Sequence, residues 1–301
     1  MAMHKIEPYE IYLGSLFALR GKKAIQDAHI SHVLSAVNGK LDLSQLPETS
    51  HLHVDIEDDE DTDLLQHLEH ALAFMDEAIS SGGAVLVHCM AGVSRSASIV
   101  CAYIMRDRQI LFDEALELVR HARPIANPND SFREQLAIFA SDGYVVNEDS
   151  TGYRRWKLKM QALESTAAGM APIPMTYNTD TTDSTSVELR CRKCRCPLAS
   201  SGAVISHIPT SSTTTQAKYG PGMVSILPAT CMHYFLDPVR WMQPELERGE
   251  LEGKLECPKC KTKVGSYRWQ GMKCSCGQWV TPGISLQRGR VDEIRRIAAK
   301  A

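Results

Sequence analysis

The segment "VHCMAGVSRS", residues 87–96, combines residue types that could bind a phosphoryl group and attack it. Five residues separate Cys89 from Arg95, between an apolar run and a helical pattern. Loop N–H groups and a helix N-terminus favour an anion, and they lower the pKa of a thiol placed there. Arg95 could donate two parallel hydrogen bonds to phosphoryl oxygens, and Gly92 allows close backbone approach. The pattern predicts a thiolate nucleophile on the floor of an anion-binding loop.

The elements that must position this loop follow from hydrophobic spacing. Residues 84–87 form a short apolar, largely β-branched run that predicts a buried strand, and helical spacing begins near Ser96. The apolar residues from Leu64 to Ile79 repeat at three and four positions and predict a helix that stops at Gly82-Gly83. A strand followed by a turn is predicted in residues 9–20, strands in 30–37 and 51–56, and helices near 21–26, 112–124 and 129–143. Alternating strands and helices predict an α/β fold.

The loop also carries a family resemblance. "VHCMAGVSRSAS" resembles the signature of the cysteine-dependent dual-specificity protein phosphatases. The resemblance continues in "YLGS" (12–15), "AYIM" (102–105) and "ARPIANPNDSFREQL" (122–136). It implies a central, mostly parallel sheet flanked by helices, and a shallow cleft that admits phosphoserine, phosphothreonine and phosphotyrosine.

The resemblance also implies a role for each residue of the site. Cys89 would attack phosphorus to form a phosphocysteine that water then hydrolyses, and Ser96 matches the hydroxyl that helps the sulfur leave. The family takes its proton donor from a loop roughly thirty residues before the cysteine. Asp58 lies 31 positions before Cys89, and Asp55, Asp59 and Asp61 remain alternatives. His88 resembles a histidine that braces the loop, and Asn129 could tie the loop to its surroundings. The phosphate-binding loop would comprise His88, Met90, Ala91, Gly92, Val93 and Ser94.

Length and charge bound the rest of the protein. A chain of 301 residues should form about two domains, and no 18-residue apolar run or signal-peptide core is evident, so we expect no membrane association and an intracellular protein. Residues 1–185 hold 15 Lys and Arg against 27 Asp and Glu, net −12. Residues 186–301 hold 18 against 9, net +9, which predicts a different and more anionic partner for the second part.

Clustered cysteines predict metal sites in this second part. Eight of the ten cysteines fall between residues 191 and 276, and clustering in a reducing compartment favours metal over disulfides. Two closed tetrahedral Zn²⁺ sites need eight ligands. One set is predicted as Cys257, Cys260, Cys274 and Cys276; the other as Cys191, Cys194 and Cys231 with His207 or Cys196. We favour His207 because Cys196 lies only two residues beyond Cys194, and His233 is a weaker candidate.

Three segments are predicted: a phosphatase domain in 1–150, a helix and flexible linker in 151–186, and a zinc-binding domain in 187–301. With its ending "CGQWVTPGISLQRGRVDEIRR", the chain resembles the Yvh-type dual-specificity phosphatases, which carry a C-terminal zinc-binding domain. That resemblance implies phosphoprotein substrates, two structural Zn²⁺ ions and a role with pre-60S ribosomal particles, through ribosomal RNA or protein, in cytoplasm and nucleus. An alternative is a ribosome assembly factor that acts mainly through the zinc domain, with phosphatase activity dispensable.

Overall fold

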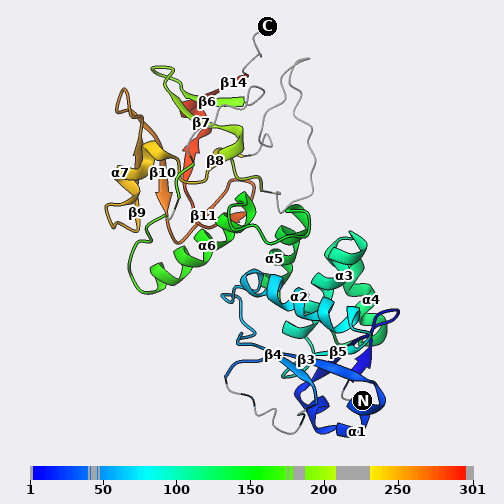
Figure 1. The fold of residues 1–301 in the computed structure, drawn as a ribbon. Coiled ribbons are helices and arrows are strands. Elements are labelled where there is room, and N and C mark those ends of the chain that lie inside the picture. The colour runs from blue at the N-terminus through cyan, green and yellow to red at the C-terminus, as the bar shows by residue number, and fades with distance from the viewer. Residues whose placement is uncertain are drawn as a thin grey trace. The chain divides into compact units, whose positions relative to one another are not determined.

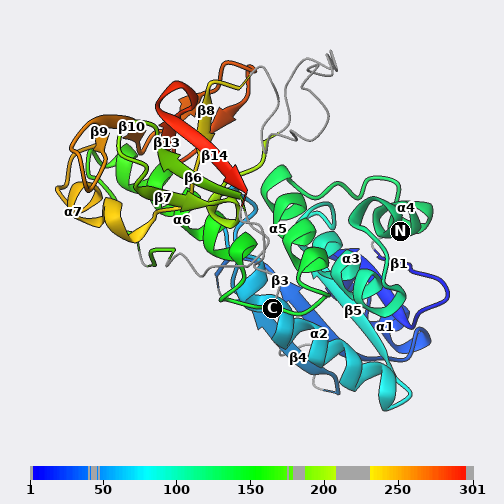
Figure 2. The same cartoon turned by 90° about the horizontal axis from the view of Figure 1, so that it is seen from above.

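The computed structural model describes residues 3–39, 41, 46, 48–174, 176–178, 187–207 and 231–295. The chain divides into two compact units, Met1–Arg154 and Arg155–Ala301, which Figures 1 and 2 show in two views. Residues 179–186, the end of the predicted linker, lie outside the described residues. Among the described residues, no helix has the length and apolar character needed to span a membrane.

The first unit is built on a five-stranded sheet in the order β1-β2-β5-β3-β4. Its strands are β1 (Met3–Lys5), β2 (Ile11–Ser15), β3 (Ile30–Ala36), β4 (Ser50–Val54) and β5 (Ala84–Cys89). All neighbouring pairs are parallel except β1 with β2. The predicted mostly parallel sheet is therefore confirmed, while the short antiparallel edge strand β1 was not anticipated from the sequence.

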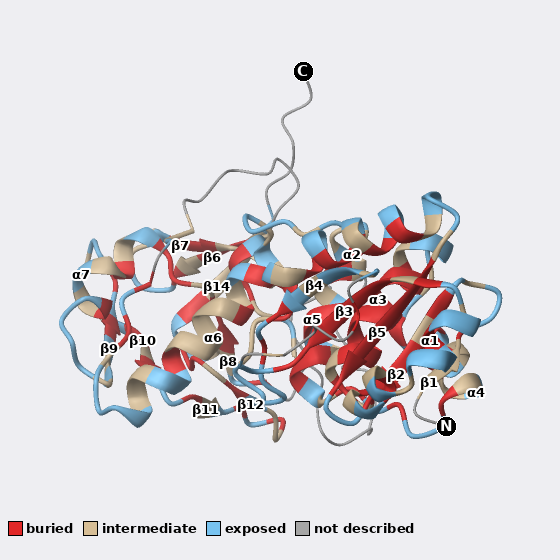
Figure 3. Cartoon of the chain, turned by 60° about the horizontal axis from the view of Figure 1, so that its bottom comes forward, coloured by how far each residue is buried: buried red, intermediate tan, exposed pale blue. Residues whose placement is uncertain are grey.

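Helices cover both faces of this sheet. They are α1 (Lys22–Asp27), α2 (Leu65–Ser80), α3 (Arg95–Arg108), α4 (Phe112–Ala122) and α5 (Asp130–Ser141). Figure 1 shows α2 to α5 on one face and α1 on the other. Successive residues of a strand point to opposite faces, and Ala84 and Leu86 of β5 accordingly pack with Ile25 of α1. Every residue of β5 is buried, as Figure 3 shows, because both of its faces are covered.

The predicted helix that stops at a double glycine is α2. Gly82 has φ +78°, Gly83 N donates to Ala78 O at 3.0 Å, and Gly82 N donates to Ile79 O at 3.0 Å. These two bonds form a Schellman cap, whose left-handed residue strongly favours glycine. The cap ends α2 so that the chain can enter β5, the strand that carries Cys89.

The second unit consists of small antiparallel sheets around one core. A four-stranded sheet contains β8 (His233–Phe235), β13 (Ser285–Gln287), β10 (Lys263–Arg268) and β9 (Glu252–Glu256). A three-stranded sheet contains β14 (Val291–Arg295), β6 (Val187–Cys191) and β7 (Pro197–Ser200), and a third pairs β11 (Met272–Lys273) with β12 (Trp279–Val280). Helix α6 (Thr151–Ala167) crosses the division, and its Ala162 is buried in this core. The short helix α7 (Gln243–Leu246) contributes Leu246 to the same core.

Candidate active site and metal centres

The carbonyl groups of the loop between β5 and α3 accept hydrogen bonds from groups outside the loop. The hydrogen bonds run from Leu16 N to Met90 O (3.2 Å), from Arg123 Nη2 to Ala91 O (2.7 Å), from Arg123 Nε to Gly92 O (2.7 Å), from Asn127 N to Val93 O (2.8 Å) and from Ser98 N to Ser94 O (2.8 Å). In a trans peptide the N–H points away from the preceding carbonyl. The N–H groups of residues 91–95 therefore point to the inner side of the loop, where they can receive an anion.

Gly92 is required where the loop passes β2. Its φ is +69°, and a Cβ there would lie 2.4 Å from Gly14 O and 2.8 Å from Arg123 Nη2. Any side chain would push the loop away from β2 and from Arg123. It would also be strained in the left-handed conformation. Glycine at this position preserves the shape of the cradle.

The Cys89 sulfur lies within this cradle and accepts two hydrogen bonds. Gly92 N donates to Sγ at 3.2 Å, and Ser96 Oγ donates at 3.1 Å. Burial raises the pKa of the thiol, but hydrogen bonds from the Ser96 hydroxyl and from backbone N–H groups outweigh it, so the pKa lies below its ordinary value. Cys101, buried in α3, provides the contrast, because burial raises its pKa to about 12. The loop therefore favours the thiolate at Cys89, and the core opposes it at Cys101.

His88 contacts the neighbouring strand rather than the sulfur. Its Nε2 lies 2.7 Å from Ser35 Oγ of β3, and its Nδ1 lies 3.4 Å from Cys89 O. Burial lowers the pKa of His88 to about 4, so the imidazole is neutral at physiological pH. These contacts link the residue before Cys89 to the sheet, and the neutral ring contributes no positive charge near the sulfur.

Arg95, the first residue of α3 after the loop, contacts the segment that carries Asp58. Arg95 Nη1 donates to Ile56 O at 3.2 Å, and Arg95 Nε lies 3.5 Å from Asp58 Oδ2. No hydrogen-bond acceptor is found for this buried Nε among the described residues, so the Asp58 contact is an ion pair and not a hydrogen bond. The guanidinium therefore keeps donors available for a phosphoryl group, and a carboxyl group stands beside them.

The neighbouring acidic residues have other contacts. Asp59 Oδ1 accepts from Thr62 N at 2.7 Å and from Asp61 N at 3.1 Å. Burial raises the pKa of Asp59, but the hydrogen bonds from Thr62 and Asp61 outweigh it and the pKa is lowered. Asp55 accepts from Gly39 N at 2.9 Å. Of the four candidates, Asp58 is the one whose carboxylate contacts Arg95 in the described structure.

Sequence reasoning assigned no role to Arg123 or Ser35. Arg123 ends α4, is 5% exposed, and holds two consecutive carbonyl groups of the loop, while its Nη1 lies 2.9 Å from His4 Nδ1. An arginine directly after an amphipathic helix, within a stretch quoted for the family resemblance, was the available signal. Ser35 lies in a continuous buried strand and offered no signal, because only the pairing of β3 with β5 brings it to His88.

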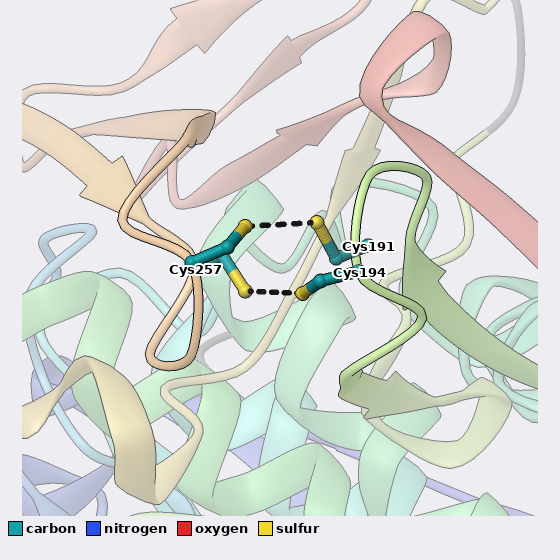
Figure 4. A group of neighbouring side chains, drawn as sticks. Cys191, Cys194 and Cys257 are labelled. Atoms are coloured by element: carbon teal, nitrogen blue, oxygen red, sulfur yellow. Dashed lines mark hydrogen bonds between the residues drawn. The ribbon is translucent and has the colours of Figure 1, made fainter.

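Two groups of metal-ligand side chains form in the second unit. Their members are Cys191, Cys194, Cys257 and Cys260 in the first group, and His207, Cys231, Cys274 and Cys276 in the second. Within each group all ligand atoms lie within 4.8 Å of one another. Figure 4 shows the first group, with Cys191 and Cys194 facing the loop that carries Cys257. These eight residues are the predicted ligand set, with His207 included and Cys196 and His233 outside both groups.

The distances in both groups suit an ion with tetrahedral coordination. In a tetrahedral thiolate site with Zn–S near 2.3 Å, sulfurs lie about 3.8 Å apart. Here Cys194 and Cys257 sulfurs are 3.5 Å apart, and Cys191 and Cys260 sulfurs are 3.8 Å apart. In the second group His207 Nε2 lies 3.2 Å from the Cys274 sulfur and 3.4 Å from the Cys231 sulfur. Each group can hold one ion.

The two CxxC turns of the first group are alike in backbone as well as in sequence. Arg195 and Lys261, each directly after the second cysteine, have φ +62° and +56°. Arg195 N donates to Cys191 O at 2.8 Å, and Lys261 N donates to Cys257 O at 3.0 Å. Matching turns thus present two pairs of sulfurs to one point.

The predicted division of the ligands between the two sites is wrong. We assigned Cys257 and Cys260 to the site of Cys274 and Cys276, whereas the structure pairs them with Cys191 and Cys194. It likewise moves Cys231 and His207 to the site of Cys274 and Cys276. The sequence prediction grouped ligands by nearness along the chain. The fold instead brings the turn after β6 against the turn between β9 and β10.

The chain is similar to known phosphatases, over the first unit and over most of its length. Residues 11–142 match the dual specificity phosphatase catalytic domain. The chain is 37% identical to the tyrosine-protein phosphatase yvh1 of Schizosaccharomyces pombe, over 95% of this chain and 84% of that protein. It is 35% identical to dual specificity protein phosphatase 12 of Rattus norvegicus, over 96% and 88%, and 34% identical to the Homo sapiens protein of that name, over 97% and 89%. With the catalytic loop and the cysteine-rich unit on one chain, the protein belongs to the Yvh1 and dual specificity phosphatase 12 family of dual-specificity protein phosphatases.

Proposed function

We propose that the first unit hydrolyses phosphotyrosine, phosphoserine and phosphothreonine in proteins through a phosphocysteine at Cys89. The thiolate attacks phosphorus, the P–O bond to the substrate breaks, and Asp58 gives its proton to the leaving oxygen. A water molecule then attacks phosphorus and returns a proton to Asp58, while the S–P bond breaks and restores the thiolate. Arg95 and the loop N–H groups bind the phosphoryl oxygens in both steps.

The observation that carries this proposal is the environment of the Cys89 sulfur. It accepts hydrogen bonds from Gly92 N and Ser96 Oγ, and Arg95, directly after the loop, pairs with Asp58. The test is rapid quenching of the enzyme with a labelled phosphotyrosine peptide, then with a phosphothreonine peptide. We expect label on the peptide that contains Cys89 in both cases. Turnover without label on that cysteine would contradict the phosphocysteine step.

Replacing Ser96 with alanine should slow the second chemical step more than the first. The hydroxyl donates to the sulfur at 3.1 Å, and a hydrogen bond to a charged group contributes about 1.5–3 kcal/mol. Its loss should lower kcat about 10- to 100-fold, with a smaller fall in kcat/KM, because the thiolate becomes a poorer leaving group. Stopped-flow assays with an aryl phosphate should then show a burst of phenolate. Equal losses in both constants without a burst would exclude this role.

We also propose that each metal-ligand group holds one structural Zn²⁺. Soft thiolates and one imidazole in a tetrahedral arrangement suit this ion, and four protein ligands leave no open position for substrate. When bound, the ion cross-links segments that are distant in sequence. The residues that would hold it are the eight named above, and their part is to position the turns of the second unit.

We further propose that the second unit brings the phosphatase to pre-60S ribosomal particles in the nucleus and cytoplasm. The family resemblance suggests this partner, and the net charge of +9 in residues 186–301, against −12 in residues 1–185, supports a polyanionic surface as the target. The competing proposal for the same surface is an assembly factor in which catalysis is dispensable. Both proposals assign particle binding to the second unit. They differ in whether the phosphatase activity of Cys89 is needed in the cell.

Sedimentation of full-length variants from cells separates these proposals. Cys89→Ser should co-sediment with large-subunit precursors as the wild type does, whereas a Cys191→Ser/Cys274→Ser variant, which damages both metal groups, should remain near the top of the gradient. Precursor binding that survives the metal-group changes would contradict targeting by the second unit. If Cys89→Ser also supports normal subunit maturation, the assembly-factor proposal is favoured over the catalytic one.

A further inference from the structure

Asn129 lies where the phosphate-binding loop, the loop of Asp58 and helix α5 meet. Its backbone N donates to Ser94 Oγ of the phosphate-binding loop at 3.1 Å. Its side-chain Nδ2 donates to Asp58 Oδ1 and to Asp59 O, both at 3.1 Å. Its Oδ1 accepts from Phe132 N at 2.8 Å and caps α5. One residue thus connects the segment that binds phosphate to the segment that carries the proposed acid.

The cap fixes the direction of the Asn129 amide. A backbone N–H can only donate, so the atom facing Phe132 N must be the side-chain oxygen. The amide nitrogen must then face the Asp58 loop, and both of its N–H groups have an acceptor there. The cap at the start of α5 therefore orients the Asn129 amide so that its N–H group donates to Asp58.

Gln135 holds the other end of the same segment. This residue is fully buried in α5, accepts from Leu64 N at 2.7 Å and donates to Thr62 O at 2.9 Å. The acidic loop is accordingly attached to α5 at Asp58 and Asp59 by Asn129 and at Thr62 to Leu65 by Gln135. A helix that also contacts the phosphate-binding loop sets the position of the carboxyl group relative to the sulfur.

From this arrangement we propose that Asn129 is a positioning residue for the general acid, which selects Oδ2 of Asp58 as the oxygen that carries the proton. A protonated carboxyl group donates from one oxygen and accepts at the other. Asn129 donates to Oδ1, so in the protonated acid the proton resides on Oδ2, which lies 3.5 Å from Arg95 Nε and accepts no hydrogen bond from it. Oδ2 therefore faces the guanidinium that binds the phosphoryl group, where the leaving oxygen must be. This inference rests on the proposed role of Asp58.

The test is the dependence of kcat/KM on leaving-group acidity in the full-length protein, with Asn129→Ser as the variant. Serine keeps a helix cap acceptor but is too short to donate to Asp58, so α5 should remain folded. A well-placed acid makes the rate nearly independent of the leaving phenol. Asn129→Ser should be within about threefold of wild type on aryl phosphates with acidic phenols, and about 10- to 100-fold slower on phenyl phosphate, since general acid catalysis contributes 10²- to 10⁴-fold.

Two further variants make the result specific. Asn147→Ser is the matched control: the side-chain oxygen of this exposed asparagine accepts from Asp149 N in a turn, and its change should leave the leaving-group dependence unaltered. Asn129→Thr keeps a hydroxyl that can cap α5 but cannot reach Asp58, and it should steepen the dependence as Asn129→Ser does. A wild-type dependence in either folded Asn129 variant, or an equal loss on every leaving group, would overturn the inference.

Asp58→Asn separates this inference from the function on which it rests. That variant should show the steepest dependence, and adding Asn129→Ser to it should cost little more, because Asn129 acts through Asp58. If Asp58→Asn leaves the dependence unchanged, the proposed acid itself is wrong. If Asp58→Asn steepens the leaving-group dependence and the Asn129 variants do not, Asp58 is still the general acid and only the positioning role of Asn129 is wrong.

Discussion

A Cys89→Ser enzyme is expected to lose about 10⁴-fold or more of its turnover on an aryl phosphate, the size of loss seen when a nucleophile is removed from an assembled site. The loop lowers the pKa of the Cys89 thiol through hydrogen bonds from Ser96 and from backbone N–H groups. A serine hydroxyl is far less acidic, and the same contacts cannot ionise it near neutral pH. Steady-state assays on full-length protein measure the loss, and calorimetry with tungstate checks that the variant still binds the anion.

Cys101→Ala is the control for this substitution. Cys101 is completely buried in α3, and its raised pKa of about 12 keeps it a neutral thiol. Its replacement should cost some stability through a small cavity but leave turnover within a few fold. A Cys89→Ser enzyme with turnover close to that of Cys101→Ala would contradict the nucleophile assignment.

The Cys89 thiolate also sets the acid limb of the pH–rate profile of the wild-type enzyme. As pH increases, activity should rise at a lower pH than an ordinary thiol would allow, because the pKa of Cys89 is lowered.

Most of the catalytic loop could be predicted from sequence because its determinants are contiguous. The run from Ala84 to Arg108 contains the strand, the loop and the helix, and the structure places β5 and α3 there. Gly92 has a positive φ, as the predicted turn suggested, whereas its close contact with Gly14 of β2 was not predicted. Asp58 is separated in sequence, yet its approximate distance from Cys89 followed from the family resemblance, and its carboxylate lies beside Arg95.

The parts that could not be predicted depend on contacts between distant segments. The predicted partition of the metal ligands failed because the pairing of Cys191 with Cys260 is set by the packing of small sheets, and no local sequence pattern indicates it. The same holds for Arg123, whose guanidinium reaches the loop only after α4 packs beside α3. The acidic run near Asp58 left three alternatives to that residue, and the ion pair with Arg95 distinguishes Asp58 from them.

The crossed arrangement of the metal ligands predicts which double variants lose one ion and which lose two. Cys191→Ser/Cys257→Ser alters one group twice, so about one ion per chain should remain. Cys257→Ser/Cys274→Ser alters both groups, so both ions should be lost. Grouping by sequence order predicts the reverse result for each variant. Zinc content by mass spectrometry of the purified full-length proteins distinguishes the two arrangements.

The loss of both ions should unfold the second unit. Binding of a structural Zn²⁺ contributes about 10–16 kcal/mol in zinc-finger peptides, which is comparable with the whole stability of a typical domain of about 5–15 kcal/mol. Chelation should therefore abolish its cooperative thermal transition, while aryl phosphatase activity of the first unit persists. Cys196→Ser is the matched control, because Cys196 lies two residues after the CxxC turn of Cys191 and Cys194 but outside both metal-ligand groups. This variant should keep two ions and a normal thermal transition. A second unit that keeps its transition without metal would show that its buried core, with Trp269, Tyr267 and Phe235, suffices for folding.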